Sequence, residues 1–507
     1  MTGAYVYVDF GAVRIQQYLT RTAGLRGHRA ASNSLARATA DASIARVVGD
    51  LAEVNPEAGK ADGVVSVRFP ADAGADRDER DERVRQVQDS VFAHLRRALP
   101  GAEFASVWGE GESYLAVHAH VLQPRLRTGR VRHDLPPVAE FPLAVPCRMC
   151  HTDPAVGTEP VPEGRLALCL DCSMRNVSRR ETVADPRSPE GWLLRDSHLQ
   201  AAPQDFASLA ALGSAASGRN HLATVAVDGN AFGAFFAALA DESSRDTDLS
   251  KAKVTVSQAL SAATRAALSD AALELSLAME QERLCVVPHV VGGDDVLVSL
   301  PAERAWRFTL TFLQEFEHRV RKATADTLHK LNGLRTERGL DELRPPTASA
   351  GIVFAHASHP LNLLVESAGQ RLSEAKRAVG GQRASVQWVD ITADGPETPA
   401  HPPLELSVLR TGDDRETAAA AALSQLVRVP ASHRARLTEA LRGSGPLTAA
   451  ALAERVGHLD AVRPFLPPLD QLNQPDQPDW PDWPDRKPVC GVGLGAALNL
   501  ARWWPCV

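Results

Sequence analysis

The chain has 507 residues, a formal net charge of −7 and 44% hydrophobic residues. This length is enough for roughly three or four domains, and the acidic balance argues against an extended, non-specific nucleic-acid surface. No apolar run reaches the length of about eighteen residues that a membrane span needs. The first residues lack the basic start and apolar stretch of a signal peptide. These features predict a cytoplasmic protein without a membrane segment.

The N-terminal part predicts a first unit of strands and helices. An apolar strand over 5–10 ends near an acid, another strand covers 63–69, and a charged helix covers about 77–98. The segment 105–117 then reads as a hairpin whose tip is Gly-Glu-Gly-Glu. Glu110 and Glu112 at that tip allow two interpretations: a scaffold that lacks paired aspartates, or a second acidic site.

Four cysteines follow in two Cys-x-x-Cys pairs. The pairs are Cys147 with Cys150 and Cys169 with Cys172, separated by 18 residues. Two such pairs at this spacing predict one tetrahedral zinc ion. Four thiolates complete the coordination shell, so the zinc is expected to be structural. An iron–sulfur cluster and two disulfides are the alternatives, and a cytosolic location argues against disulfides.

Two basic segments lie in this half of the chain. Arginines gather between Arg125 and Arg132 and again between Arg175 and Arg180. Such segments touch RNA in some proteins and are solvated surface loops in most. The sequence leaves both interpretations open.

The second half predicts a βαββαβ unit with insertions, which is a ferredoxin-like topology. Its strands alternate with long helical segments, and a hairpin lies in the middle. In that topology the first strand lies beside the hairpin. The expected strands are 222–228, 284–291, 295–300, 348–355 and 384–390, and the expected helices are about 250–281, 302–333 and 361–379.

The hairpin tip of this unit carries Gly292, Gly293, Asp294 and Asp295. Two adjacent carboxylates repel each other, and a divalent cation relieves the repulsion because Mg²⁺ prefers carboxylate oxygens. Glycines there let a phosphate approach the backbone. Asp228 ends the first strand, at the strand tip where ligands collect. We therefore expect the three aspartates to converge on Mg²⁺ or Mn²⁺ for chemistry at a nucleotide phosphate.

Each acid also has a plain structural interpretation. The Asp-Asp pair reads equally as a solvent-exposed turn, and Asp228 reads as the N-cap of the helix that follows. The N-cap role is compatible with metal binding.

The C-terminal part predicts a helical segment, followed by a proline-rich segment and an end that contains two tryptophans. Residues 403–465 are rich in alanine and leucine with helical periodicity. A proline at every third position over 474–485 predicts an extended linker. The last segment contains Trp503 and Trp504 and reads either as a docking peptide or as a poorly ordered end.

Taken together, four segments of the second unit resemble a known family. In order they are Val-Asp-Gly-Asn-Ala-Phe-Gly from residue 227, the Gly-Gly-Asp-Asp tip, Ser-Ala-Gly-Ile-Val-Phe-Ala-His from 349, and Glu-Ala-Lys-Arg-Ala-Val-Gly-Gly from 374. This combination resembles the palm domain of the large polymerase-like subunit of type III CRISPR effector complexes. The wider clan includes GGDEF-type diguanylate cyclases and class III adenylyl cyclases.

The resemblance implies an antiviral-defence enzyme that joins ATP into cyclic oligoadenylates. It implies that Asp228, Asp294 and Asp295 surround the metal ions and that Gly292 and Gly293 make room for the nucleotide. It further implies that Lys376 neutralises phosphates and that Ser349 lies near a nucleotide. A solvated helix residue is the plain interpretation of Lys376. The sequence departs from the family at Asn230, where a second acid is common, and this departure weakens the case for one metal site.

The resemblance also organises the whole chain as an α+β protein: two ferredoxin-like palm domains with a zinc-binding insertion between them and a C-terminal helical domain. The expected boundaries are a degenerate first palm over 1–140, a treble-cleft or ribbon over 141–200, a catalytic palm over 215–395, helices over 403–465 and a tail over 466–507. The family often begins with an HD nuclease domain, and no His-Asp doublet precedes Tyr5, so the expected form lacks that nuclease.

Three functions are compatible with these patterns. One is a subunit that acts with guide RNA and target RNA through the other subunits of an effector complex. Another is a stand-alone nucleotide cyclase in antiphage signalling. The third is a catalytically silent scaffold, which the intact Gly-Gly-Asp-Asp disfavours.

Overall fold

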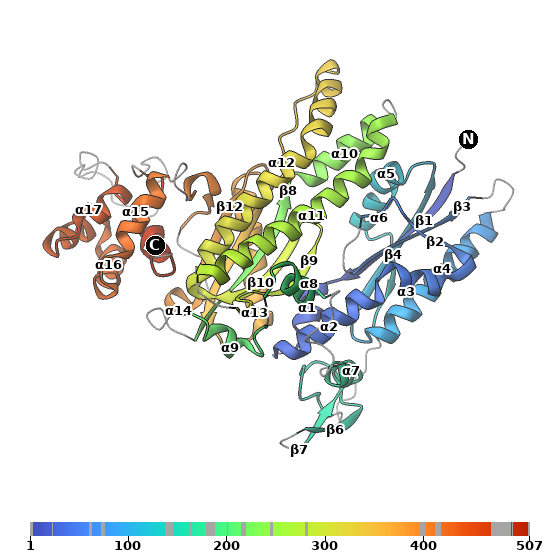
Figure 1. Ribbon diagram of the computed structural model, residues 1–507, viewed down its shortest axis with the longest axis horizontal. Helices are drawn as coiled ribbons and strands as arrows, with labels where there is room; N and C mark the ends of the chain where they lie inside the picture. Colours follow the sequence, from blue (N-terminus) through green and yellow to red (C-terminus); the bar gives the residue numbers. More distant parts are fainter. Residues whose placement is uncertain are drawn as a thin grey trace.

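The structure is a computed structural model. Its described residues are 4–22, 24–59, 63–71, 77–136, 145–161, 164–178, 188–199, 201–213, 220–243, 247–278, 282–395, 401–410, 417–467, 488 and 490–504. They form an elongated α+β molecule with two main sheets, a small two-stranded sheet and a helical end (Figure 1). The proline-rich triplets of 474–485 lie outside the described residues.

The first sheet has the order β2-β3-β1-β4-β5. Its central strand β1 pairs antiparallel with β3 on one side and β4 on the other. Alternate residues of β1 enter a core beneath α2, α3 and α4, because side chains along a strand point to opposite faces. The elements are β1 (Tyr5–Val13), α1 (Ile15–Thr20), α2 (Leu25–Ala38), α3 (Asp41–Val48), β2 (Glu53–Val54), β3 (Val64–Pro70), α4 (Arg77–Ala98), β4 (Glu103–Gly111), α5 (Tyr114–Val117), α6 (Gln123–Arg127) and β5 (Arg132–Asp134).

The hairpin predicted over 105–117 is wrong. This segment is the single strand β4, which runs alongside β1 from Glu103 to Gly111 and leads into α5. Pairing with the long strand β1 extends β4 through the glycines that suggested a turn. Glu110 sits within the strand and pairs with Arg80 of α4, N to O 2.8 Å.

The four-cysteine segment forms a small module next to the first sheet. A hairpin of β6 (Gly157–Val161) and β7 (Gly164–Leu168) leads into α7 (Leu170–Ser178), and α7 lies against α2 (Figure 1). Two short helices, α8 (Pro189–Asp196) and α9 (Phe206–Ala210), then connect to the second sheet.

The second sheet has the order β13-β12-β11-β8-β10-β9. Within it β11, β8, β10 and β9 are antiparallel, which places the first strand beside the hairpin, as predicted, and beside β11 on its other side. β12 adds parallel to β11. The strands are β8 (His221–Asn230), β9 (Val287–Gly292), β10 (Asp295–Pro301), β11 (Thr347–His356), β12 (Ser385–Asp390) and β13 (Leu404–Glu405).

Helices cover both faces of this sheet. The long helices α11 (Thr247–Ala278) and α12 (Ala305–Glu337) run side by side over one face, with α10 (Phe232–Ser243) at their end (Figure 1). α13 (Leu361–Ala378) covers the other face. Gly351 of β11 permits this contact, since a Cβ there would lie 2.1 Å from the carbonyl oxygen of Ala368. The close approach places the C-terminal turn of α13 beside the end of β8.

The C-terminal region is helical, as predicted. α15 (Ala418–Val427) and α16 (Ala431–Arg455) pack against α19 (Leu494–Leu500), and α17 (Leu459–Val462) packs against α15 and α16. α16 is kinked at Gly445, which has φ 82° and precedes a proline. These helices share one continuous core with the second sheet.

The poorly ordered alternative for the tail is wrong where the tail is described. Trp503 stacks on Phe354 with ring centroids 5.5 Å apart, and Trp504 lies 5.8 Å from Trp306. The Trp503 indole donates to Asp390 Oδ2 at 2.6 Å. The end of the described chain is therefore part of the core of the second sheet.

Within the described part of the chain, no helix combines the length and the apolar character that crossing a membrane requires.

Candidate functional site

The three aspartates predicted from the sequence lie at one end of the second sheet. Val296 of β10 faces Val227 of β8, so the same antiparallel register brings Asp295 next to Asp228. Directly opposite residues in such a pair have Cβ atoms about 4.5–5.5 Å apart. Asp294 precedes Asp295 in the turn between β9 and β10. The fold thus brings together acids from two strands that are far apart in the sequence.

The turn has a backbone conformation that glycine favours. Gly293 has φ +59°, in the left-handed region that side chains with a Cβ rarely adopt. Its carbonyl oxygen accepts a hydrogen bond from Thr264 Oγ1 of α11. The pairing of Gly292 with Asp295 closes the hairpin. Backbone geometry and one tether to α11 together fix the position of the two carboxylates.

Gly229 shapes the site in a way that the sequence analysis did not identify. A Cβ at this position would lie 2.3 Å from Asp294 Oδ2. The Asp294 carboxylate therefore packs directly on the bare backbone of β8. The signal in the sequence was the glycine immediately after Asp228, in the Val-Asp-Gly-Asn motif.

Lys376 reaches the same site from the last turn of α13. Its ammonium group forms an ion pair with Asp228 Oδ2 and donates to the carbonyl oxygen of Gly229 at 2.7 Å. The side chain is 26% exposed. The interpretation of Lys376 as only a solvated surface residue does not fit these contacts.

Burial and mutual repulsion raise the pKa values of the tip carboxyls. Burial is the larger cause for Asp295, and the neighbouring Asp228 and Asp294 add to it, so that its pKa rises to about 7. Burial and then Asp228 also raise the pKa of Asp294, against the opposing effect of Lys376. Carboxyls that repel one another in a partly buried site are a donor set suited to a divalent cation.

The carboxylates do not form a compact ligand cluster in this structure. Among the described residues, the four cysteines are the group of His, Cys, Asp or Glu whose ligand atoms all lie within 4.8 Å of one another. Asp228 is engaged by Lys376 instead. Metal binding at the aspartates therefore stays a prediction.

Ser349 lies behind the site rather than on its surface. Its side chain is fully buried, faces Asp228 in the β-pairing, and accepts from Asn230 Nδ2 at 2.8 Å. It also lies 3.0 Å from Ser385 Oγ. Asn230 further donates to Arg383 O at 2.8 Å. In this structure the hydroxyl of Ser349 is engaged within the protein, and its contact with a nucleotide stays a prediction.

The buried amide of Asn230 explains one departure from the family pattern. It joins the ends of β8 and β11 and the segment before β12, because its Nδ2 lies within hydrogen-bond distance of three acceptors, the third one Thr347 Oγ1 at 3.1 Å, which share its two N–H donors. A carboxylate could not donate any of these bonds. Asn230 therefore acts in the sheet, behind the three aspartates.

One residue of the first unit also touches the site. Gln16 of α1 donates to Asp295 Oδ2 at 3.4 Å, and α1 packs against α13. No sequence pattern pointed to Gln16. This contact connects the first unit directly to the hairpin tip.

The pKa of Asp295 gives a pH prediction for cation binding. Below about pH 7 its carboxyl is protonated in the metal-free protein, and a cation must displace that proton. We expect the apparent affinity for Mn²⁺ to fall by up to roughly tenfold per pH unit below 7 and to level off above it. Calorimetric titrations at pH 6, 7 and 8 measure this. Asp295→Asn should bind more weakly and flatten the dependence, and a profile that is equally steep in this variant would contradict the assignment.

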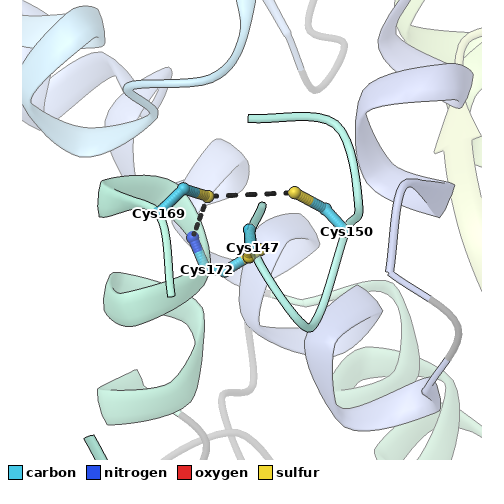
Figure 2. A group of neighbouring side chains, drawn as sticks. All are labelled: Cys147, Cys150, Cys169 and Cys172. Carbon is cyan, nitrogen blue, oxygen red and sulfur yellow. Dashed lines mark hydrogen bonds between the residues drawn. The ribbon is translucent and has the colours of Figure 1, made fainter. Parts of the chain in front are cut away.

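The four cysteines form a second candidate site. Cys147, Cys150, Cys169 and Cys172 converge from the loop before β6 and the start of α7 (Figure 2). All four are buried, and none is in a disulfide. The Sγ atoms of Cys150 and Cys169 are 3.9 Å apart. Tetrahedral zinc with bonds of about 2.3 Å implies a sulfur separation near 3.8 Å, so the geometry fits a metal ion and excludes the disulfide alternative.

Clustering makes four free thiols an unfavourable set to ionise together. The hydrogen bond with Cys150 is the main cause that raises the pKa of Cys169 to about 12. The pKa of Cys172 is raised by its bonds with Cys150 and Cys169. Only a cation at the centre would let all four act as thiolates. The buried cluster can thus hold a metal ion.

The cysteine module is fixed to the first unit by buried polar contacts. Tyr18 donates to Asp171 Oδ1 at 2.7 Å, and Arg175 donates to the same carboxylate and to the backbone of Tyr18. Arg21 contacts Cys150 Sγ at 3.6 Å and pairs with Asp153. This assigns Arg175 to packing, rather than to an exposed basic surface.

Comparison with known proteins identifies the second sheet and its helices. Residues 221–386 match the family model of the second palm domain of Cas10/Cmr2. This part of the chain is similar to the second palm domain of Cas10/Cmr2. The matched range contains all three aspartates, both glycines of the tip, Ser349 and Lys376, and the match confirms the resemblance that the motifs suggested.

Solved structures resemble the chain over nearly its whole length. A Csm1–Csm4 cassette in complex with cA4 aligns with a TM-score of 0.54 and 12% identity, over 98% of this chain and 70% of that chain. The Csm1–Csm4 subcomplex of a type III-A CRISPR-Csm interference complex aligns with a TM-score of 0.54 and 13% identity, over 98% of this chain and 70% of that chain. Csm1 in T.onnurineus aligns with a TM-score of 0.52 and 14% identity, over 99% of this chain and 70% of that chain. No curated protein sequence matches the chain. At these identities the structures establish a shared α+β fold.

Proposed function

We propose that this protein is the cyclase-like large subunit of a type III CRISPR system and joins ATP into cyclic oligoadenylates. The observation that carries the proposal is the meeting of Asp228, Asp294 and Asp295 at the end of a sheet that matches the Cas10/Cmr2 second palm. Crystal structures of the similar Csm1–Csm4 cassette exist with one ATP and with cA4. Those ligands belong to a protein of the same fold and support ATP as the substrate here.

Different residues of the palm would bind different parts of a nucleoside triphosphate. The three aspartates would hold divalent cations, Mg²⁺ or Mn²⁺, which when bound lower the charge of the phosphates and polarise the attacked phosphorus. Gly292 and Gly293 leave the backbone of the tip open to phosphate oxygens. Lys376 supplies a positive charge, and Thr264 and Gln16 hold the tip in place.

We propose the domain organisation that follows from this assignment. A first palm-like domain over 1–140 lacks the paired aspartates and serves as scaffold. A structural zinc site occupies 141–200, the catalytic palm occupies 215–395, the helical domain 403–465, and the tail 466–507. A cytoplasmic subunit built this way would act with guide RNA and target RNA through partner subunits.

The proposed function is tested by product analysis. The protein, alone and with candidate partner subunits and target RNA, is incubated with labelled ATP and Mg²⁺ or Mn²⁺, and the products are resolved by mass spectrometry. Cyclic 3′–5′ adenylates and released pyrophosphate support the proposal. Absence of product in every combination, together with absence of metal-dependent nucleotide binding, would favour a silent scaffold.

Lys376 provides a separate test of phosphate binding. Lys376→Ala should raise the KM for ATP or lower kcat by roughly tenfold, because one charged contact to phosphate is lost. Lys376→Arg is the matched control, since it keeps the charge. Arg377, the next residue of α13, gives a position control through Arg377→Ala. If Lys376→Ala has the same KM for ATP and the same kcat as wild type, Lys376 does not bind the phosphates.

A further inference from the structure

A cavity of about 300 Å³ lies in the first unit, away from the aspartates. It opens beside the outer strand pair, where β5 pairs with β4 only as far as Ser106. Val107 and Trp108 continue along β4 beyond that point and line the cavity. The lining of this cavity contains none of the three aspartates and none of the four cysteines, so the cavity is separate from both candidate sites.

Three arginines line the cavity and give it a positive charge. They are Arg125, Arg130 and Arg132, the segment that the sequence analysis left open between RNA contact and plain surface. Arg132 pairs with Asp89 at 2.5 Å. Arg125 donates to the carbonyl oxygen of Trp108 at 2.5 Å, and within the described ranges neither Arg125 nor Arg130 has a carboxylate partner. Two of the three guanidinium charges are thus left uncompensated.

An aromatic ring and a buried polar floor complete the cavity. Trp108 is half-buried, and the guanidinium carbon of Arg125 lies 5.5 Å from the centre of its ring. Gln88 donates to Ser106 Oγ at 3.0 Å, and both side chains are buried and line the cavity. Arg132 also donates to Gln88 Oε1 at 3.3 Å, so Gln88 holds Ser106 and Arg132 in fixed positions beside the cavity.

We propose that this cavity is a second, non-catalytic site for a nucleoside phosphate. Guanidinium groups match the geometry of phosphate oxygens, and an indole ring provides a plane on which a base stacks. The volume lies at the lower end of the range for small-ligand sites and is of the order of one nucleotide unit. The phosphate can belong to a free nucleotide or to the 5′ end of an RNA strand, which share this chemistry.

Calorimetric titration with AMP, without added divalent cation, tests the proposal. Omitting the cation leaves the carboxylates of the palm repelling the phosphate. Arg130→Glu should weaken AMP binding by at least about tenfold, because a charged contact is replaced by repulsion. Arg130→Lys should keep most of the affinity. The matched control is Arg127→Glu, which places the same charge change on an exposed residue of α6 outside the cavity.

Four further titrations separate the sources and exclude the palm. Binding of AMP that is much tighter than that of inorganic phosphate or of adenosine supports a nucleoside phosphate, and equal binding of inorganic phosphate overturns it. A short 5′-phosphorylated RNA that binds more tightly than AMP assigns the site to an RNA end, and equal affinity assigns it to free nucleotides. Lys376→Ala should not change AMP binding. Unchanged AMP binding in Arg130→Glu, or its loss in Lys376→Ala, overturns the proposal without affecting the proposed palm activity.

Discussion

Replacing both Asp294 and Asp295 with Ala should abolish adenylate synthesis, a loss of at least about a thousandfold. Both carboxyls lie at the hairpin tip next to Asp228, and their pKa values are raised first by burial and then by the repulsion that a bound cation would relieve. Without them a single carboxylate remains, and it is paired with Lys376. Release of labelled pyrophosphate from ATP measures the effect.

The same variant should fold normally. Asp294 and Asp295 are only partly buried, and removing two mutually repelling acids takes no packed apolar group from the core. A thermal unfolding midpoint close to that of wild type and an unchanged zinc content are the expected controls. A single change, Asp294→Asn, keeps the shape of the side chain and separates charge from size. If the double variant makes product at the wild-type rate, the chemistry lies elsewhere in the chain.

Loss of one cysteine ligand should destabilise the module over 145–178 by several kcal/mol, because metal binding and local folding are coupled. Cys172→Ser is the sharpest change, since Cys172 is fully buried at the start of α7. Wild-type protein should contain one zinc per chain and no iron. Elemental analysis and limited proteolysis of this module measure both effects.

Cys285→Ser is the matched control for the zinc experiment. Cys285 is also buried, but it is bonded to Ser276 and the backbone of Arg283, outside the cluster. This variant should retain the zinc. Iron in place of zinc would establish the iron–sulfur alternative, and a purified protein with well under one metal ion per chain would exclude the site.

The sequence was sufficient for the hairpin tip and the first strand of the palm. Apolar runs that end in Asp228 or flank Gly-Gly-Asp-Asp indicate strands, and the glycines between the last two runs indicate the turn that joins them. The two Cys-x-x-Cys pairs were equally informative, since four buried thiols at that spacing have few other uses.

Other features depend on contacts that no local pattern encodes. The Gly-Glu-Gly-Glu segment resembles a turn, yet pairing with β1 keeps it extended. Gln16 and Asp295 are 279 positions apart in the sequence, and only the packing of α1 on α13 brings them together. The family motif predicted that Ser349 lies near a nucleotide. In the structure its hydroxyl instead accepts a hydrogen bond from Asn230 within the sheet.

The contacts of the segment around the tryptophan pair after α19 imply that the first sheet completes its core before the second sheet during synthesis of the chain. Trp388 bonds to Asn499 across 111 positions, and Asp390 bonds to Trp503 across 113. A nascent chain that has just completed β12 therefore still lacks part of the core beneath that strand. The first sheet contains its own core partners within about a hundred residues and can close much earlier. We expect a ribosome-bound chain stalled after β12 to carry a protease-resistant first unit and a palm that is still open to cleavage.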